Sequence, residues 1–135
     1  MTTSTKPVPD ITQENRPFFE AAKRRELFVQ RCGACGVLRF PAREICSACL
    51  SSRREWVKVS GRGEVFSFNV MHQLYHPGFA SEVPYAVVVI KLAEGPKMNS
   101  NLLGVPPQEI RVGMPVRVLF EDLTDEVTLP KFAPA

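Results

Sequence analysis

Four cysteines constrain the fold of this chain more than any other feature. They form two C-x-x-C pairs, Cys32/Cys35 and Cys46/Cys49, with ten residues between the pairs. A C-x-x-C turn directs two sulfurs at one point, and two such turns supply the four thiolates of a tetrahedral zinc site. Gly36, directly after the first pair, suits a tight turn because glycine adopts a positive φ without steric cost. We therefore predict a zinc ribbon in which these four cysteines bind Zn²⁺.

Two other uses of the cysteines remain open at this level. Two disulfides require an oxidising compartment, whereas the N-terminal residues lack the apolar segment of a signal peptide. A redox pair of the thioredoxin type leaves the second C-x-x-C without a role. If all four thiolates bind one metal, no coordination position stays open for water or substrate, and we expect the ion to be structural.

The size and composition of the chain fit one ordinary domain, or a small domain with a mini-domain attached. It has 135 residues, of which 44% are hydrophobic and 23% charged, as in globular proteins that do not enter membranes. The longest apolar run, Ala86–Ile90, is far too short to span a bilayer. We therefore expect a cytoplasmic protein that does not enter the membrane.

The pattern along the chain predicts a mainly β fold. Residues 1–12 read as a flexible tail, and 13–26 as a helix capped by Asn15 with Pro17 in its first turn. Residues 27–54 form the predicted ribbon. Short alternating segments then follow without a helical period, which predicts a five-stranded antiparallel barrel of the OB type over 55–135.

Positive charge is concentrated around the cysteines. Residues 16–62 carry eleven Lys and Arg against four Asp and Glu, whereas residues 63–135 carry five against eight. A basic region beside a metal ribbon suits an anionic partner.

Further residues are typical of one known family. They are Leu27…Gln30-Arg31-Cys32-x-x-Cys35-Gly36, Phe40-Pro41-x-Arg43, Cys46-x-x-Cys49, Trp56, Ser60-Gly-Arg-Gly63, Val83-Pro84-Tyr85, Leu92-x-Glu94-Gly95, Gly113-Met-Pro-Val116 and Pro130-x-Phe132. In this order the chain resembles, over residues 12–132, the rubredoxin-like zinc-ribbon/OB-fold proteins that accompany thiolases and thiolase-like aldolases. One departure is Ala42, where the family often has a second proline.

The resemblance implies a non-catalytic accessory subunit in a hetero-oligomer with a thiolase-fold enzyme. It also implies that the complex acts on acyl-CoA and that the small subunit completes the substrate channel. Guanidinium groups bind phosphates in a bidentate manner. We therefore consider five basic residues as contacts to coenzyme A or to the partner, with a solvated surface as the alternative for each: Arg24, Arg25, Arg31, Arg39 and Arg43.

Four aromatic residues are candidates for the partner interface. Phe18 and Phe19 lie in the predicted helix, and Tyr75 and Phe79 lie in the loop 75–84. Exposed aromatic residues away from a core often mark binding surfaces. The alternative for the two helix residues is packing against the ribbon or the barrel.

We do not expect catalysis by this chain alone. His72 and His76 are its two histidines, and neither belongs to a recognisable nucleophile–base motif. The alternative function is binding of single-stranded nucleic acid, because OB folds stack bases on aromatic side chains. Phe66 and Phe68 lie two residues apart on a predicted strand and would share a face. The acidic balance of the barrel segment argues against this function.

Overall fold

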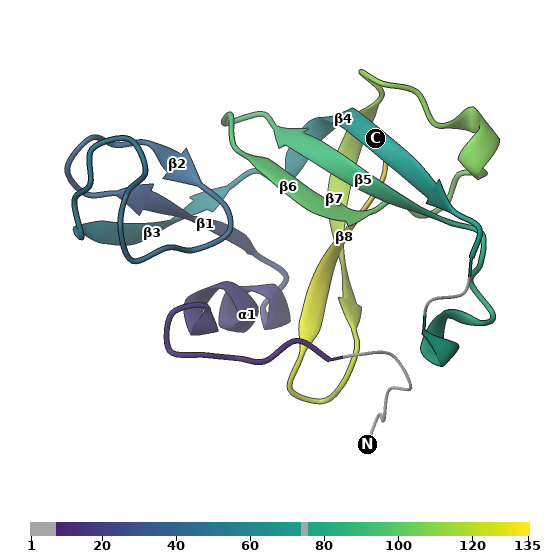
Figure 1. Ribbon diagram of the computed structural model, residues 1–135, viewed down its shortest axis with the longest axis horizontal. Helices are drawn as coiled ribbons and strands as arrows, with labels where there is room; N and C mark the ends of the chain where they lie inside the picture. The colour runs from purple at the N-terminus through teal and green to yellow at the C-terminus, as the bar shows by residue number, and fades with distance from the viewer. Residues whose placement is uncertain (1–7, 74–75) are drawn as a thin grey trace.

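The computed structural model describes residues 8–73 and 76–135. Figure 1 shows a ribbon and a barrel joined end to end, with one helix between them. The elements are α1 (Arg16–Lys23), β1 (Leu27–Cys32), β2 (Leu38–Arg39), β3 (Arg54–Val59), β4 (Arg62–Met71), η1 (Pro77–Phe79), β5 (Tyr85–Leu92), β6 (Lys97–Asn101), η2 (Pro107–Glu109), β7 (Pro115–Asp122) and β8 (Thr128–Pro134). No helix within the described residues is long and apolar enough to cross a membrane.

The helix α1 is shorter than the predicted 13–26. Asn15 occupies the N-cap position, but its side chain makes no cap hydrogen bond. Instead its Oδ1 accepts from the Thr12 N–H at 2.7 Å and its Nδ2 donates to the Asp10 carbonyl at 3.1 Å. Asn15 therefore fixes the loop that precedes the helix.

The first sheet is antiparallel and has the strand order β2-β1-β3. Six register pairs join β1 to β3, from Leu27↔Val59 to Cys32↔Arg54. The segment around Trp56, which we placed with the barrel, thus pairs with the ribbon strand β1. The domain boundaries stay a proposal.

The second sheet is the predicted five-stranded antiparallel barrel, in the order β6-β5-β4-β7-β8. A parallel bridge between Leu102 and Phe132 brings its two edges together, so the barrel is nearly closed. Its interior holds alternate residues of the strands, among them Val88, Ile90 and Phe132, each fully buried. The mainly β prediction is confirmed.

A β-bulge interrupts the pairing of β4 with β5 between Val65 and Ser67. The extra residue, Phe66, is 47% exposed, whereas Phe68 packs against the core. Our expectation that the two phenylalanines share a face was wrong, because an extra residue changes the side on which the side chain emerges.

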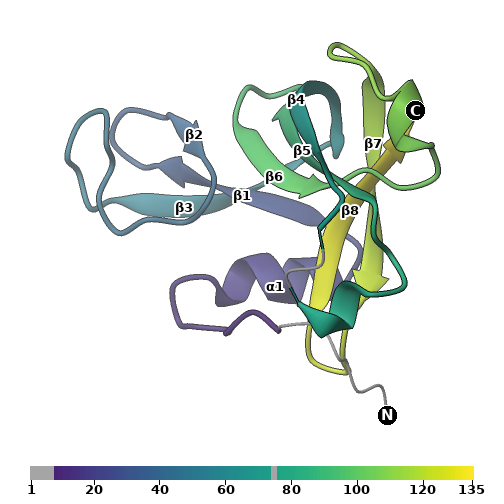
Figure 2. The same cartoon turned by 45° about the vertical axis from the view of Figure 1, so that its right-hand side comes forward.

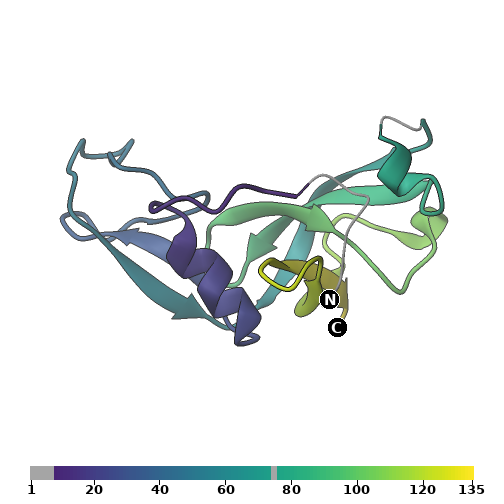
Figure 3. The ribbon, with the colours of Figure 1, turned by 90° about the horizontal axis from the view of Figure 1, so that it is seen from below.

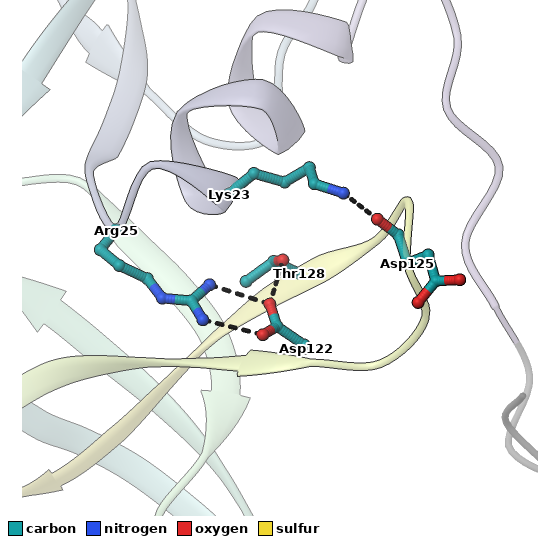
Figure 4. A network of polar contacts seen from close by, with 5 residues as sticks. All are labelled: Lys23, Arg25, Asp122, Asp125 and Thr128. Atoms are coloured by element: carbon teal, nitrogen blue, oxygen red, sulfur yellow. Dashed lines mark hydrogen bonds and ion pairs between the residues drawn. The ribbon is translucent and has the colours of Figure 1, made fainter. Parts of the chain in front are cut away.

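One ion pair and one hydrogen bond connect the end of α1 to the β7–β8 hairpin (Figure 4). Arg25 donates from both terminal nitrogens to the Asp122 carboxylate, at 2.9 and 2.8 Å, and Lys23 donates to the Asp125 carbonyl. The Thr128 hydroxyl also donates to Asp122, at 2.6 Å. These contacts bridge segments about one hundred residues apart in sequence, and Figure 2 shows α1 beside β8.

Candidate metal centre and partner surfaces

The two C-x-x-C turns fold in the same way. In the first, the Gly36 N–H donates to the Cys32 carbonyl at 3.0 Å, and in the second the Leu50 N–H donates to the Cys46 carbonyl at 2.9 Å. Gly36 and Leu50 both adopt a positive φ, 78° and 64°. The turn thus requires a left-handed residue after each pair, and the second turn places there a leucine, which disfavours that conformation.

The four sulfurs converge on one point. All lie within 4.8 Å of one another, with Cys32 and Cys49 3.6 Å apart and Cys35 and Cys46 3.7 Å apart. Four sulfurs about 2.3 Å from one tetrahedral ion would stand roughly 3.8 Å apart. The four cysteines are therefore positioned to bind a metal.

Backbone N–H groups stabilise the charged form of two of these thiols. The N–H groups of Cys35 and Ala34 point at the Cys32 sulfur, each at 3.4 Å, and together they lower the pKa of Cys32 to about 6. The N–H groups of Cys49 and Ala48 likewise lower the pKa of Cys46. A metal binds the thiolate form, so these donors prepare the site for a cation.

The pKa of the Cys49 thiol is shifted in the opposite direction, upward. Although the Ser51 N–H favours its charged form, the contact with Cys32 and burial raise the pKa of Cys49 to about 11. Crowded thiolates repel one another, and a divalent cation at their centre would relieve this repulsion.

The five arginines predicted to contact an anion do not form one site. Three of them belong to ion pairs within the chain: Arg24 with Glu26, Arg25 with Asp122, and Arg31 with Glu55. Their guanidinium groups are thus already engaged by carboxylates. An anion contact through any of the three would compete with these pairs.

The other two arginines lie around a buried glutamine. Arg39 is 8% exposed, and its Nε donates to the Gln30 Oε1 at 2.6 Å. The Arg43 N–H donates to the same oxygen at 2.8 Å, while the Arg43 side chain is exposed. Gln30 therefore fastens the loop that leads into the second cysteine pair. The family resemblance includes Gln30, but its role was not predicted, because no local pattern marks a strand glutamine as buried.

The candidate interface residues also separate. Phe18 and Phe19 are each only 8% exposed and belong to the hydrophobic core. Phe18 contacts the Phe40 ring, with centroids 5.2 Å apart. The two residues pack inside the fold, as our alternative expected, and the exposure on which the interface hypothesis rested is not found. Tyr75 lies outside the described residues.

Phe79 lies at the far end of the molecule from the ribbon. Figure 3 shows η1 and the cysteine loops at opposite ends of the long axis. The Phe79 ring stacks on Tyr85, with centroids 5.2 Å apart. Both line a hollow of about 250 Å³ that also contains Leu102 and Lys131. A partner that contacts Phe79 does not reach the metal centre at the same time unless it spans the barrel.

The two histidines have ordinary surroundings. The His76 Nδ1 accepts from the Gly78 N–H at 3.0 Å and so caps η1. His72 is exposed after the end of β4. Within the described residues neither ring is hydrogen-bonded to a hydroxyl or thiol, so no nucleophile–base pair forms around them.

Comparison with known proteins agrees with this architecture. The family model for the ChsH2 rubredoxin-like zinc ribbon domain matches residues 19–55, and that for the ChsH2 C-terminal OB-fold domain matches residues 56–121. A solved chain of the "Ltp2-ChsH2(DUF35) aldolase" is 42% identical, with a TM-score of 0.85. The match covers 94% of this chain and 98% of that one.

Two curated relatives show how the region is used elsewhere. The probable enoyl-CoA hydratase alpha subunit of Thermomonospora curvata is 42% identical over 96% of this chain, which spans only 40% of that longer protein. The benzoylsuccinyl-CoA thiolase subunit BbsA of Thauera aromatica is 33% identical, over 73% of this chain and 68% of its own length. The resemblance drawn from the cysteine pairs and the later motifs is confirmed. The chain therefore belongs to the ChsH2 (DUF35) family, which joins a rubredoxin-like zinc ribbon to an OB-fold domain.

Proposed function

We propose that the chain is a non-catalytic subunit of a complex with a thiolase-fold enzyme, either a thiolase or an aldolase, that acts on acyl-CoA. The match to a chain of the Ltp2-ChsH2(DUF35) aldolase carries this proposal, because it extends over nearly the full length of both chains. The similarity to a benzoylsuccinyl-CoA thiolase subunit supports the same class of partner and substrate. In such a complex the partner supplies the catalytic groups.

The metal in this proposal is zinc, and its role is structural. Four thiolates in a closed set suit Zn²⁺, and the sulfur separations fit a tetrahedral ion. Bound zinc would supply a cross-link between the two cysteine turns. Thiols that bind metal must stay reduced, which favours the cytoplasm as the compartment.

We further propose that the chain helps to enclose the acyl-CoA channel of its partner. The names of both curated relatives contain a CoA thioester. The hollow beside Phe79 and Tyr85 is one surface that could adjoin such a channel. Among the five arginines, Arg43 offers an exposed guanidinium that is not paired within the described residues.

Co-expression with the thiolase-fold proteins of the same genome tests this function. A tagged copy of the chain should recover one such protein in a fixed ratio, and the complex should turn over an acyl-CoA substrate faster than the partner alone. The isolated chain should turn over none. Recovery of no thiolase-fold protein, or turnover of acyl-CoA by the isolated chain, would refute the proposal. Tight, salt-sensitive binding of single-stranded DNA would support the nucleic-acid alternative instead.

The longer hydratase relative suggests a second partner. In the Thermomonospora protein the region that matches this chain is part of a polypeptide called a hydratase alpha subunit. A hydratase chain could therefore belong to the same complex. Size-exclusion chromatography of the co-expressed proteins, followed by mass spectrometry of the complex, tests for it.

A further inference from the structure

The outer face of the barrel carries two pairs of like charges. Arg62 of β4 lies directly opposite Arg117 of β7, and Lys91 of β5 lies directly opposite Lys97 of β6. All four side chains are exposed. Side chains at directly opposite positions of antiparallel strands are about 4.5–5.5 Å apart at Cβ, and like charges there destabilise the sheet. The fold alone gives no reason for this arrangement.

No ion pair within the described residues engages these charges. None of the four side chains takes part in an ion pair in residues 8–73 and 76–135, whereas Arg24, Arg25 and Arg31 do. Glu64, which lies opposite Lys91 on the same face, forms no ion pair with it. The strands concerned are neighbours in the sheet (Figure 1), so the charges share one surface. Although the barrel segment is acidic overall, this face is basic.

Exposed apolar groups lie among these charges. Phe66 projects from the bulge in β4, and the Lys97 ammonium stands 3.9 Å from the centroid of its ring, which places the ring on the same outer face. The neighbouring loop carries Val112, which is 66% exposed. A hydrogen bond of 2.8 Å from the Gly113 N–H to the Val65 carbonyl fastens this loop to the bulge.

We propose that this basic barrel face, defined by Arg62, Phe66, Lys91, Lys97, Val112 and Arg117, binds an acidic surface of the partner enzyme. The inference rests on the proposed function and names the surface through which the complex forms. Acidic side chains of the partner would relieve both like-charge pairs, and an apolar side chain would cover Phe66. Aromatic residues and arginine dominate the energetics of protein interfaces.

A bound phosphate group explains the observations less completely. Two arginines across a strand pair could hold a phosphate, but such a small anion would leave Phe66 and Val112 in water. It would also leave the lysine pair without a counter-charge. A protein surface can satisfy all of these groups at once.

The affinity of the purified partner for variants of this chain tests the inference, measured by biolayer interferometry at low and moderate salt. Arg62→Glu combined with Arg117→Glu should weaken binding at least ~10-fold and reduce its salt dependence, and Phe66→Ser should weaken it by a similar factor. Arg16→Glu with Arg53→Glu is the matched control. It makes the same change in net charge on exposed arginines away from this barrel face and should alter affinity by less than ~3-fold. Circular dichroism and metal content confirm that each variant is folded.

A second measurement uses the isolated chain. Because Arg62 and Arg117 repel each other without the partner, Arg117→Gln should raise the midpoint of thermal unfolding above that of the wild type. Added salt should reduce the difference between the two midpoints. If the wild type binds its partner but both barrel variants bind equally well, the inference is wrong while the proposed function stands. Perturbation of Arg62 and Arg117 by inorganic phosphate in NMR spectra, with partner affinity unchanged in the variants, would instead identify a phosphate site. A wild-type chain that binds no thiolase-fold protein overturns both proposals.

Discussion

Removal of the metal should unfold the two cysteine loops of the ribbon and leave the barrel intact. The segments 33–37 and 41–51 contribute no side chain to the buried hydrophobic cluster. Their large apolar residues are exposed instead, with Val37 at 45%, Ile45 at 49% and Leu50 at 76%. Apolar burial therefore cannot hold these loops, and the bond from each sulfur to the ion must do so.

The magnitudes favour a local transition. Zinc binding to a four-ligand site of this kind supplies about 10–16 kcal/mol, which equals or exceeds the usual net stability of a whole domain, about 5–15 kcal/mol. Within the part of the chain that the structure describes, the cysteine loops have no other interaction that could compensate for the loss of this binding free energy. The barrel, however, keeps its own core, which includes Val88, Ile90 and Phe132, and none of these residues depends on the cysteine loops.

Hydrogen–deuterium exchange with and without a strong chelator measures whether only the cysteine loops unfold. We expect loss of protection at the amides of Cys32, Gly36, Cys46 and Leu50, each of which is hydrogen-bonded within the two turns. Amides within β5 should keep their protection. Cys46→Ser, without chelator, should give the same pattern. Loss of protection in β5 at the same chelator concentration, or persistence of the four turn amides after complete removal of the metal, would refute the reasoning.

Three further substitutions have expected outcomes. Leu50→Gly removes a side chain held at a φ of 64° and should stabilise the metal-bound protein by about 1 kcal/mol; chemical denaturation measures the change, and a loss of stability would contradict it. Asp122→Asn should destabilise the protein at neutral pH. The hydrogen bonds from Arg25 hold the pKa of Asp122 below its ordinary value, so this stability is present above the ordinary pKa and fades as the pH falls toward the folded value. Urea titrations of the wild type and of Asp122→Asn, from pH 7 down to pH 3, should show that the difference between their free energies of unfolding becomes smaller. Phe18→Ala should lower the free energy of unfolding by about 3–5 kcal/mol because the ring is buried, and partner affinity of the folded variant should hardly change; a large loss of affinity at unchanged stability would restore the interface hypothesis.

The features that sequence could predict are local ones. The spacing of the cysteines is short enough for each C-x-x-C turn to form from its own residues, so the metal ligands follow directly from it. The alternation of apolar residues in segments such as Tyr85–Leu92 likewise identifies a strand with one buried face. Each of these signals depends on neighbours within a few residues along the chain.

The features that sequence could not predict depend on pairing between distant segments. Arg25 and Asp122 are 97 residues apart, and nothing local indicates that they meet. The opposition of Arg62 and Arg117 depends on the register of β4 with β7. A tally of charge along the chain placed the basic surface on the ribbon. Ion pairs engage Arg24, Arg25 and Arg31, whereas one face of the barrel keeps cations that form no ion pair within the described residues.

The contact between α1 and the barrel helps to connect the ribbon to the barrel. Arg25 has a φ of 64° and turns the chain from the helix into β1. Its side chain donates two hydrogen bonds to the Asp122 carboxylate. Leu27 and Val29 of β1 and Val59 of β3 extend the same core toward the ribbon. The cysteine loops are therefore attached to the barrel through the hydrogen-bonded pair of strands β1 and β3, which shares the core, and through the Arg25–Asp122 ion pair. A partner that docks on the basic barrel face would thus find the ribbon at a defined distance, and loosening the Arg25–Asp122 contact should weaken the complex only if the partner touches both parts.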